Sequence, residues 1–266
     1  MLVEQIPVNN DLRNYMYLIA CSDTQEAVAI DPLDHAVCLQ RANELGWTIR
    51  GVINTHEHHD HIGGNDEVIA VTGATLYAHY QAVDKIANVD VALKAGDVVQ
   101  VGTSVRLISM DTPGHTFCHT CLYFAGGDSV APALFCGDTL FNAGVGNCHN
   151  GGDPQIMYQT FAEQIYVLPN ETSIYPGHDY IENNLEFTLD REPDNMAAKS
   201  LLVAIQQWNG EKHFISNIAM EKAVNTFFRL ESKTVIDLLN KEFPELGVTP
   251  SDETVFLKLR ELRNSW

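Results

Sequence analysis

The sequence predicts an α/β fold in which two β-sheets are covered by helices, followed by a smaller helical domain. Two observations carry this prediction. Up to about residue 180, short runs of β-branched and aromatic residues alternate with turns and amphipathic stretches. Beyond that point, helical patterns follow one another. The 266 residues are enough to bury a sizeable core, and we expect an α/β domain over 1–179 and a helical domain over 180–266.

Strand-like segments make up most of the predicted α/β domain. Each of them is short, rich in β-branched or aromatic residues, and bounded by polar turns. We expect strands at 14–20, 26–30, 50–54, 75–78, 105–108, 121–124, 133–136 and 172–175.

Helices are expected between these strands near 34–46, 65–72 and 154–168. In the last of them, Asp153 is placed to cap the N-terminus, and Pro154 suits the first helical position because its missing N–H has no partner there.

The C-terminal part contains three further helical patterns. A helix capped by Asp194 should end at Asn209-Gly210, and another should span 232–243 and stop before Pro244. The last helix begins at Thr249-Pro250, and its apolar spacing predicts that it buries Val255, Leu259, Leu262 and Trp266.

Composition excludes several classes of function. The chain has 16 Lys and Arg against 35 Asp and Glu, a net charge of −19, which argues against nucleic acid or an anionic membrane as partner. No uncharged apolar run approaches the roughly 18 residues that a membrane helix needs. The N-terminus lacks a basic start followed by an apolar stretch, so we expect no secretory signal. The six cysteines then indicate reduced thiols, including the Cys118-x-x-Cys121 pair, and a cytoplasmic protein.

The strongest chemical signal is the segment Thr55-His56-Glu57-His58-His59-Asp60-His61, directly after the strand expected at 50–54. Four potential metal ligands lie within six residues, namely His56, His58, Asp60 and His61. Imidazoles with one carboxylate suit Zn²⁺ or Fe²⁺. Without an ion, these crowded polar groups would lose contact with water and gain no partner in return, which costs free energy. His59 is expected to point away from the ligands, because side chains alternate along this segment.

Three later segments repeat one arrangement, in which an apolar run ends in glycine and then presents a histidine or aspartate. They contain Gly114-His115, Gly137-Asp138 and Gly177-His178. Glycine lets the backbone turn closely around a buried site. Each pair alone is typical of an ordinary turn, but together with the first segment they predict one shared metal site.

The order His-x-His-x-Asp-His, Gly-His-Thr, Gly-Asp-Thr and Gly-His resembles the metallo-β-lactamase superfamily. That resemblance implies a four-layer αββα sandwich with its metal site at one edge of the sheets. Residues 137–141, 175–187 and 192–195, with the helical C-terminus, are similar to the glyoxalase II (hydroxyacylglutathione hydrolase) family. This implies a catalytic domain over 1–179 and a substrate-binding helical domain over 180–266.

The resemblance also implies the ligand set of two divalent ions, with zinc expected and iron or manganese as alternatives. One ion would be held by His56, His58 and His115, and the other by Asp60, His61 and His178, with Asp138 between them. Asp60 and Asp138 are therefore the expected catalytic carboxylates. Two ions that share a water lower its pKa from ~15.7 towards ~7, which makes hydroxide available for attack on a thioester carbonyl. The thiolate of the thioester is a good leaving group, so no side chain is needed to protonate it.

The expected substrate is S-D-lactoylglutathione or another S-2-hydroxyacylglutathione, a thioester of methylglyoxal detoxification. Arg260 and Arg263 lie three apart on the last helix and could hold a carboxylate, and Tyr180 matches a tyrosine that contacts glutathione in the family. In the loop 146–151, Asn147 and His149 stand where the family usually has a basic and an aromatic residue. These two differences predict weaker binding of the glutathione backbone or a different substrate.

The same sequence pattern is also compatible with other functions. A mononuclear iron persulfide dioxygenase of the same superfamily shares the metal motifs but lacks a long helical tail, and lactone, ester or β-lactam hydrolysis would use the same metal chemistry. An inactive metal-binding module is a further class. We expect a monomer or a weak homo-oligomer. His119 is expected to hydrogen-bond near the metals, and Cys21, Cys38 and Cys136 to lie in the core.

Overall fold

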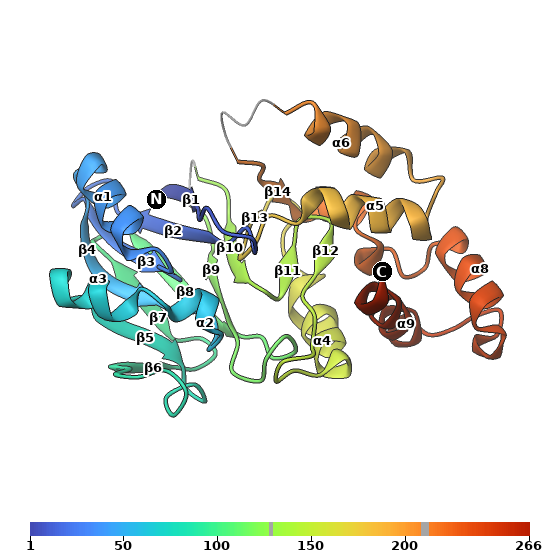
Figure 1. Ribbon diagram of the computed structural model, residues 1–266, viewed down its shortest axis with the longest axis horizontal. Helices are drawn as coiled ribbons and strands as arrows, with labels where there is room; N and C mark the ends of the chain where they lie inside the picture. The colour runs from blue at the N-terminus through green and yellow to red at the C-terminus, as the bar shows by residue number, and fades with distance from the viewer. Residues whose placement is uncertain (128–129, 209–212) are drawn as a thin grey trace.

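Two six-stranded β-sheets form the centre of the protein. The computed structural model describes residues 1–127, 130–208 and 213–266 (Figure 1). The first sheet runs in the order β1-β2-β3-β4-β5-β6 and contains β1 (Leu2–Pro7), β2 (Tyr15–Ala20), β3 (Glu26–Ile30), β4 (Thr48–Ile53), β5 (Thr75–His79) and β6 (Val91–Leu93). The second runs in the order β14-β13-β10-β9-β8-β7 and contains β7 (Val98–Val101), β8 (Val105–Asp111), β9 (Thr120–Phe124), β10 (Ala133–Gly137), β13 (Ser173–Pro176) and β14 (Ser216–Asn217).

A short hairpin, β11 (Leu140–Phe141) and β12 (Gly144–Val145), stands apart from both sheets. The helices around the sheets are α1 (His35–Leu45), α2 (His59–Ile62), α3 (Asn65–Thr72) and α4 (Pro154–Thr160), which continues as a π-helix over Phe161–Ile165. The C-terminal part contains α5 (Ile181–Arg191), α6 (Met196–Gln206), α7 (Ile218–Val224), α8 (Lys233–Glu242) and α9 (Asp252–Ser265), with short 3₁₀ turns at Thr226–Phe228 and Pro244–Leu246.

Three apolar clusters define the layers. Tyr17 and Ile30 from the first sheet meet Leu107 and Phe135 from the second between the two sheets. On the other face of the first sheet, residues such as Leu18 and Val52 pack against Cys38 and Ala42 of α1 and Val68 of α3. The outer face of the second sheet is covered by Met157, Phe161 and Ile165 of the α4 segment. The predicted αββα sandwich is thereby confirmed.

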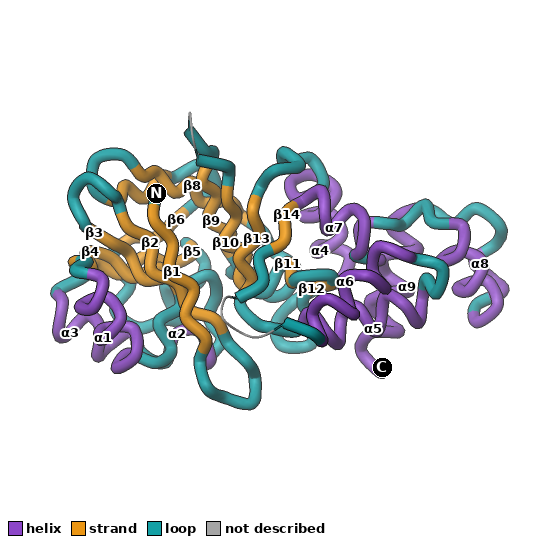
Figure 2. The backbone as a smooth tube through the Cα atoms, turned by 90° about the horizontal axis from the view of Figure 1, so that it is seen from above, coloured by secondary structure: helices purple, strands orange, loops and turns teal. Residues whose placement is uncertain are grey.

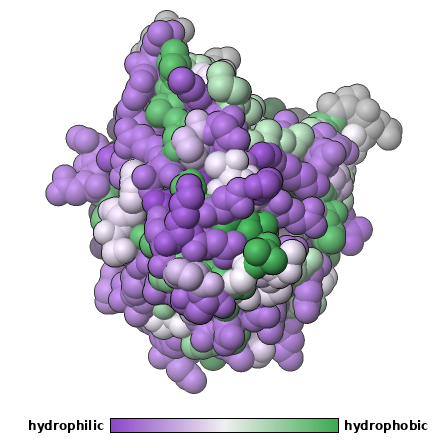
Figure 3. Space-filling model, turned by 90° about the vertical axis from the view of Figure 1, so that its right-hand side faces the viewer, coloured by the Kyte–Doolittle hydropathy of each residue, from purple (hydrophilic) through white to green (hydrophobic). Residues whose placement is uncertain are grey.

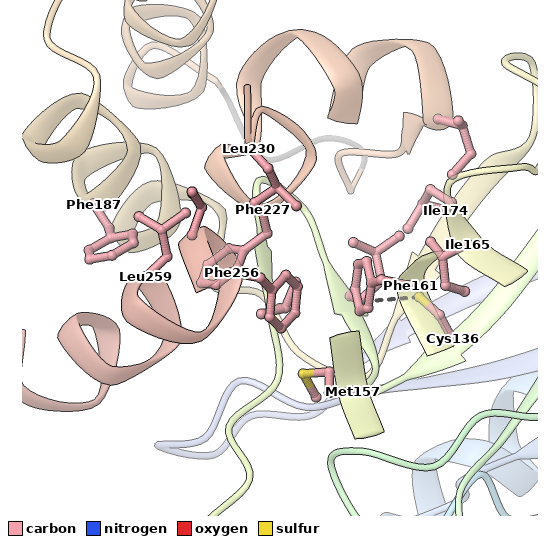
Figure 4. Packing of buried hydrophobic residues seen from close by; sticks show 14 of the residues in the cluster. Cys136, Met157, Phe161, Ile165, Ile174, Phe187, Phe227, Leu230, Phe256 and Leu259 are labelled. Carbon is pink, nitrogen blue, oxygen red and sulfur yellow. Dashed lines mark hydrogen bonds between the residues drawn. The ribbon is translucent and has the colours of Figure 1, made fainter. Parts of the chain in front are cut away.

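The C-terminal helices are continuous with the outer helical layer of the second sheet. In both views they lie at the opposite end of the molecule from α1 and α3 (Figures 1 and 2). Phe256 and Leu259 of α9 belong to the same buried cluster as Phe161 and Ile174, and the Phe161 and Phe256 ring centroids are 5.6 Å apart (Figure 4). We retain the division at 179/180 as a proposal about domains, and this shared core predicts that the two parts unfold together.

Most of the expected elements are present at the predicted places, and Asp153 caps α4 by accepting hydrogen bonds from Gln155 N and Ile156 N. Three predictions for the C-terminal helices are wrong. The last helix, α9, begins at Asp252 after the N-cap Ser251, and not at Thr249-Pro250. Asn195, and not Asp194, caps α6 through a bond from Ala198 N. Trp266 is 49% exposed, because α9 ends at Ser265 and leaves the last side chain at the rim.

Other predictions are correct only in part. Leu262 is only partly buried. The predicted end of the α6 helix, Asn209-Gly210, lies outside the described residues. The sequence predicted none of the four edge strands, β1, β6, β7 and β14, each of which is paired on one side only and is short or carries polar residues.

The face that carries the C-terminal helices is mostly hydrophilic, with apolar residues in small separate patches (Figure 3). Within 1–127, 130–208 and 213–266, no helix combines the length and the apolar character that crossing a bilayer requires.

Candidate metal centre

The four predicted metal-binding segments meet at one edge of the sandwich because each of them follows the end of a strand. His56, His58 and the α2 residues come after β4, and His115 comes after β8. Asp138 and His178 follow β10 and β13, which pair in parallel, so that both carboxyl ends point to the same edge. Local sequence therefore presents each ligand, and the sheets bring the ligands together.

Three overlapping groups of side chains are close enough to hold a metal ion, with their ligand atoms within 4.8 Å of one another: His56, His58 and His115; His56, His61 and Asp138; Asp60, His61 and His178. In the first group, His58 Nδ1 lies 3.0 Å from His56 Nε2 and 3.1 Å from His115 Nε2. In the third, His61 Nε2 lies 3.3 Å from His178 Nε2. The structure thus brings together all seven residues that the sequence suggested as ligands.

Each histidine of these groups has its second ring nitrogen next to an oxygen atom outside the cluster. His61 Nδ1 is 3.0 Å from Asp31 Oδ2, and His178 Nδ1 is 2.7 Å from Leu12 O. The corresponding oxygen atoms for the remaining histidines belong to Thr55 for His56, Asn150 for His58 and Asn147 for His115. A ring nitrogen that donates to such an oxygen leaves the lone pair of the other nitrogen facing the centre, as metal ligation requires.

Asp138 stands between the two outer groups. Its Oδ2 lies 3.2 Å from His178 Nε2 and 3.5 Å from His115 Nε2, one nitrogen from each group. Its Oδ1 is buried and accepts no hydrogen bond from any described residue. A Cβ at Gly177 would lie 2.2 Å from that oxygen, so only glycine fits there. A buried carboxylate oxygen without a donor is costly unless a cation neutralises it, and these residues therefore fit a metal site.

The electrostatics of the cluster point the same way. Burial, and then the neighbouring His61, lower the pKa of His56 far below its ordinary value, so His56 is neutral. Burial opposes ionisation of Asp138, but His178 and His61 outweigh it and hold the pKa of Asp138 well below its usual range. Burial also opposes a charge on His61, yet Asp138, Asp31 and Asp60 raise its pKa to about 9. The carboxylates thus stabilise positive charge at the centre, which a divalent cation supplies.

Several residues that hydrogen-bond to the candidate metal ligands were not predicted from the sequence. Asp31 follows β3 and accepts from Thr55 N at 2.8 Å and from Thr55 Oγ1 at 2.7 Å, besides its contact with His61. Asn14, only 1% exposed, donates to both the carbonyl oxygen and Oδ2 of Asp60. The only local signal for either residue is its position at a strand end, which is common to many polar residues.

Glu57 is a further unpredicted contact. It accepts from Lys85 and from Thr116 and so joins the loop of His56 to that of His115. The expectation for His119 is confirmed, since its Nε2 accepts from Asp138 N at 3.2 Å and its ring stacks on that of His56. His59 is exposed, as alternation predicted.

All six cysteines are free thiols, Cys118 and Cys121 included. Cys21, Cys38 and Cys136 are buried in the core, as expected.

All five residues that the sequence suggested for substrate binding line one cavity of about 240 Å³. It is lined by Phe141, Val145, Asn147, His149, Tyr180, Asn184, Arg260, Arg263 and Asn264. The ring of Tyr180 stacks on that of the metal-cluster residue His178, with centroids 5.0 Å apart, so the cavity opens beside the metal centre. A larger hollow of about 410 Å³ near Lys222 and Phe228 contains none of the metal-cluster residues.

The two arginines of this cavity differ in their contacts. Arg260 is 4% exposed and donates from Nη1 to Val145 O and Gly146 O. Arg263 is half-buried and reaches Asn184 Oδ1 at 3.4 Å. No ion pair among the described residues involves either arginine, and burial lowers the pKa of Arg260 to about 10. Two desolvated cations without a carboxylate partner attract an anionic ligand.

Comparison with known proteins agrees with both parts of the site. Residues 12–178 match the family model of the metallo-beta-lactamase superfamily, and residues 179–266 match that of the hydroxyacylglutathione hydrolase C-terminus. The chain is 56% identical over 266 residues to a hydroxyacylglutathione hydrolase of Nitrosococcus oceani and 57% identical over 266 residues to one of Polaromonas sp., with 100% of each chain covered.

Solved structures show the same architecture. ETHE1 from Myxococcus xanthus superposes with a TM-score of 0.67 at 26% identity, over 91% of this chain and 92% of that chain. The BLEG-1 B3 metallo-beta-lactamase shares the fold, with a TM-score of 0.65 at 21% identity, over 85% of this chain and 99% of that one. With both family models matched in succession and close relatives covered end to end, the chain belongs to the metallo-β-lactamase superfamily and, within it, to the hydroxyacylglutathione hydrolase family.

Proposed function

We propose that this protein is a metal-dependent thioester hydrolase that cleaves S-2-hydroxyacylglutathione, S-D-lactoylglutathione above all, to the hydroxy acid and glutathione. The observation that carries the proposal is the position of the arginine-lined cavity directly beside the His and Asp cluster. A glutathione thioester has a carboxylate-bearing tail and a reactive carbonyl group, and the two halves of this site match those two parts.

The metal ions would be held by His56, His58 and His115 on one side and by Asp60, His61 and His178 on the other, with Asp138 between them. When bound, they supply a water of lowered pKa and positive charge for the developing oxyanion. Neutral imidazoles and ionised carboxylates are the protonation states that such ions need. Burial favours the neutral form of His56, and the neighbouring His178 and His61 favour the ionised form of Asp138.

The protein itself contributes orientation. Arg260 and Arg263 would attract the glutathione carboxylate, and Tyr180 lies between them and the metal cluster, with its hydroxyl 3.2 Å from His178 Nδ1. The Phe141 ring stands edge-on to those of His178 and Tyr180, at centroid distances of 5.8 and 5.3 Å, and covers the junction of cavity and cluster. When the tail is held in this way, the thioester carbonyl lies next to the His and Asp cluster, and the reaction proceeds as if both groups belonged to one molecule.

Asn147 and His149 line the cavity in the places where the sequence predicted a departure from the family pattern. Both are exposed, and Asn147 contacts His115 through its backbone oxygen rather than its side chain. We therefore infer that Asn147 contributes no cation to glutathione binding and that Arg260 and Arg263 account for most of the electrostatic attraction. Zinc as the resident metal, a cytoplasmic location and a monomeric or weakly oligomeric state complete the proposal.

The proposal is tested by metal analysis of the purified protein together with assays of thiol release. Release of glutathione from S-D-lactoylglutathione by metal-loaded protein is the expected result. Oxygen uptake with glutathione persulfide, or hydrolysis confined to lactones or β-lactams, would instead assign one of the other chemistries of the superfamily. Bound metal with no turnover of any thioester or ester would indicate an inactive metal-binding module.

A further inference from the structure

A buried carboxylate on α7 holds the turn of the β11–β12 hairpin. Glu221 is completely buried, and its Oε2 accepts from Ala143 N at 2.9 Å and from Asn225 Nδ2 at 2.9 Å. Its Oε1 accepts from Ser216 Oγ at 2.5 Å. Ser216 Oγ in turn accepts from Asn142 Nδ2 at 2.8 Å. Both turn residues of the hairpin are therefore tied, directly or through one hydroxyl, to this one side chain.

The turn requires such support. Ala143 has a φ of 59°, in the left-handed region that residues with a Cβ rarely occupy, at a cost of roughly 1–2 kcal/mol. Its N–H is the group that Glu221 accepts from. The backbone oxygens on either side of Ala143 are held as well, that of Asn142 by Asn184 at 3.0 Å and that of Gly144 by Asn225 at 3.2 Å. Conformation and hydrogen bonding at this turn are thus set by the C-terminal helices.

The hairpin forms one wall of the arginine-lined cavity. Phe141 of β11 and Val145 of β12 both line it, and Val145 O accepts from Arg260. Beyond β12, Asn147 O lies 2.6 Å from His115 Nδ1. A change at the turn would therefore move the apolar wall and the arginine of the cavity together.

Stability alone does not account for a carboxylate here. Its hydrogen-bond partners, Ser216 of β14, Asn225 after α7 and the Asn142-Ala143 turn, are all neutral, and no ion pair among the described residues includes Glu221. Burial raises its pKa to about 7, and Cys136 is the neighbouring titratable group that its charge affects. A buried charge among neutral partners costs free energy. What the carboxylate provides is geometry, because it holds three donors at fixed positions around the hairpin turn.

We propose that Glu221 is a positioning residue for glutathione recognition, which acts through the Asn142-Ala143 turn to hold Phe141, Val145 and Arg260 in the wall of the substrate cavity. This rests on the proposed thioester hydrolysis. Glu221 touches neither the cavity nor the metal cluster, and its effect is on binding of the glutathione tail rather than on the chemistry at the metals.

The test compares Glu221→Gln and Glu221→Ala with Glu192→Gln. Glu192 is a matched control because it is also a buried carboxylate of the helical part that accepts three side-chain donors, Arg229, Ser232 and Asn195, none of them in the hairpin. Each variant is assayed at pH 8 with S-D-lactoylglutathione and with the lactoyl thioester of N-acetylcysteamine, which lacks both carboxylates of glutathione. Metal content and Tm are measured on the same samples.

We expect Glu221→Ala to raise the KM for the glutathione thioester about tenfold, which corresponds to ~1.4 kcal/mol of lost binding, and Glu221→Gln to raise it less, because one amide oxygen still accepts. The kcat/KM for the truncated thioester and the metal content should stay at the wild-type level. Glu192→Gln should lower Tm without changing KM.

Three outcomes would overturn the inference: unchanged KM in both Glu221 variants, an equal loss with both thioesters, or the same KM increase in Glu192→Gln. If wild-type protein releases no thiol from S-D-lactoylglutathione, the proposed function fails instead, which is a separate result.

Discussion

Asp31 Oδ2 and His61 Nδ1 lie 3.0 Å apart next to the His and Asp cluster of the candidate metal centre, and both side chains are almost completely buried. The same carboxylate accepts from the backbone and hydroxyl of Thr55. One aspartate at the end of β3 therefore orients a ligand of one metal group and, through Thr55 and its contact with His56 Nδ1, a ligand of the other.

Replacing Asp31 by Asn should weaken metal binding about 10–100-fold, as is typical when the partner of a ligating histidine is lost. Metal affinity can be measured by competition with a chromophoric chelator. Asp111→Asn is the control, because Asp111 forms a similar pair with His79, 3.1 Å apart, outside the cluster. Equal losses in the two variants would mean that the effect is a general one on stability.

Substituting Asp138 by Ala should remove metal and thioester hydrolysis together. Asp138 is the only residue of the cluster with contacts below 3.6 Å to His61, His115 and His178, so no other carboxylate takes its place between the two groups. Metal content per chain and thiol release are measured in parallel. A variant with a normal metal content would contradict the position of Asp138 between two ions.

The two arginines of the cavity should respond differently to replacement. Arg263→Ala should raise the KM for the glutathione thioester about tenfold with little change in kcat, as expected when uniform binding is lost. Arg260→Ala should raise KM and also lower Tm, because Val145 O and Gly146 O lose their donor. If neither variant changes KM, glutathione is bound elsewhere.

Glu221 should also leave a signature in the pH dependence of stability. Its pKa in the folded protein is raised to about 7 by burial, so the unfolded chain ionises first and stability falls as pH rises from about 4.5 to 7. The loss amounts to about 3 kcal/mol and is complete above pH 8. Glu221→Gln lacks this titration, and its free energy of unfolding relative to wild type should therefore increase over that range. Urea unfolding between pH 5 and 8 measures the difference, and a difference that does not vary with pH would contradict the raised pKa.

The ligand segments could be predicted because each is local. His56 to His61 occupy one loop, and His115, Asp138 and His178 each follow a glycine at the end of an apolar strand. Such patterns are visible without knowledge of the fold, and the strand ends then bring them to one edge. The supporting residues were not predictable in this way. Asn14 is 46 residues from Asp60, and Asp31 is 30 from His61, and no periodicity reports a contact over such distances.

By itself, therefore, the amino-acid order determined most of the central strands and their flanking helices, and the types of metal-binding side chains with their places after the strands. These features depend on neighbours along the chain. Tertiary structure alone decided which oxygen orients each imidazole and that Arg260 binds two backbone oxygens of the cavity wall. It also decided that Glu221 of α7 holds a turn 78 residues earlier in the chain. These relationships arise from burial, because a polar group removed from water must find a partner wherever the packed chain offers one.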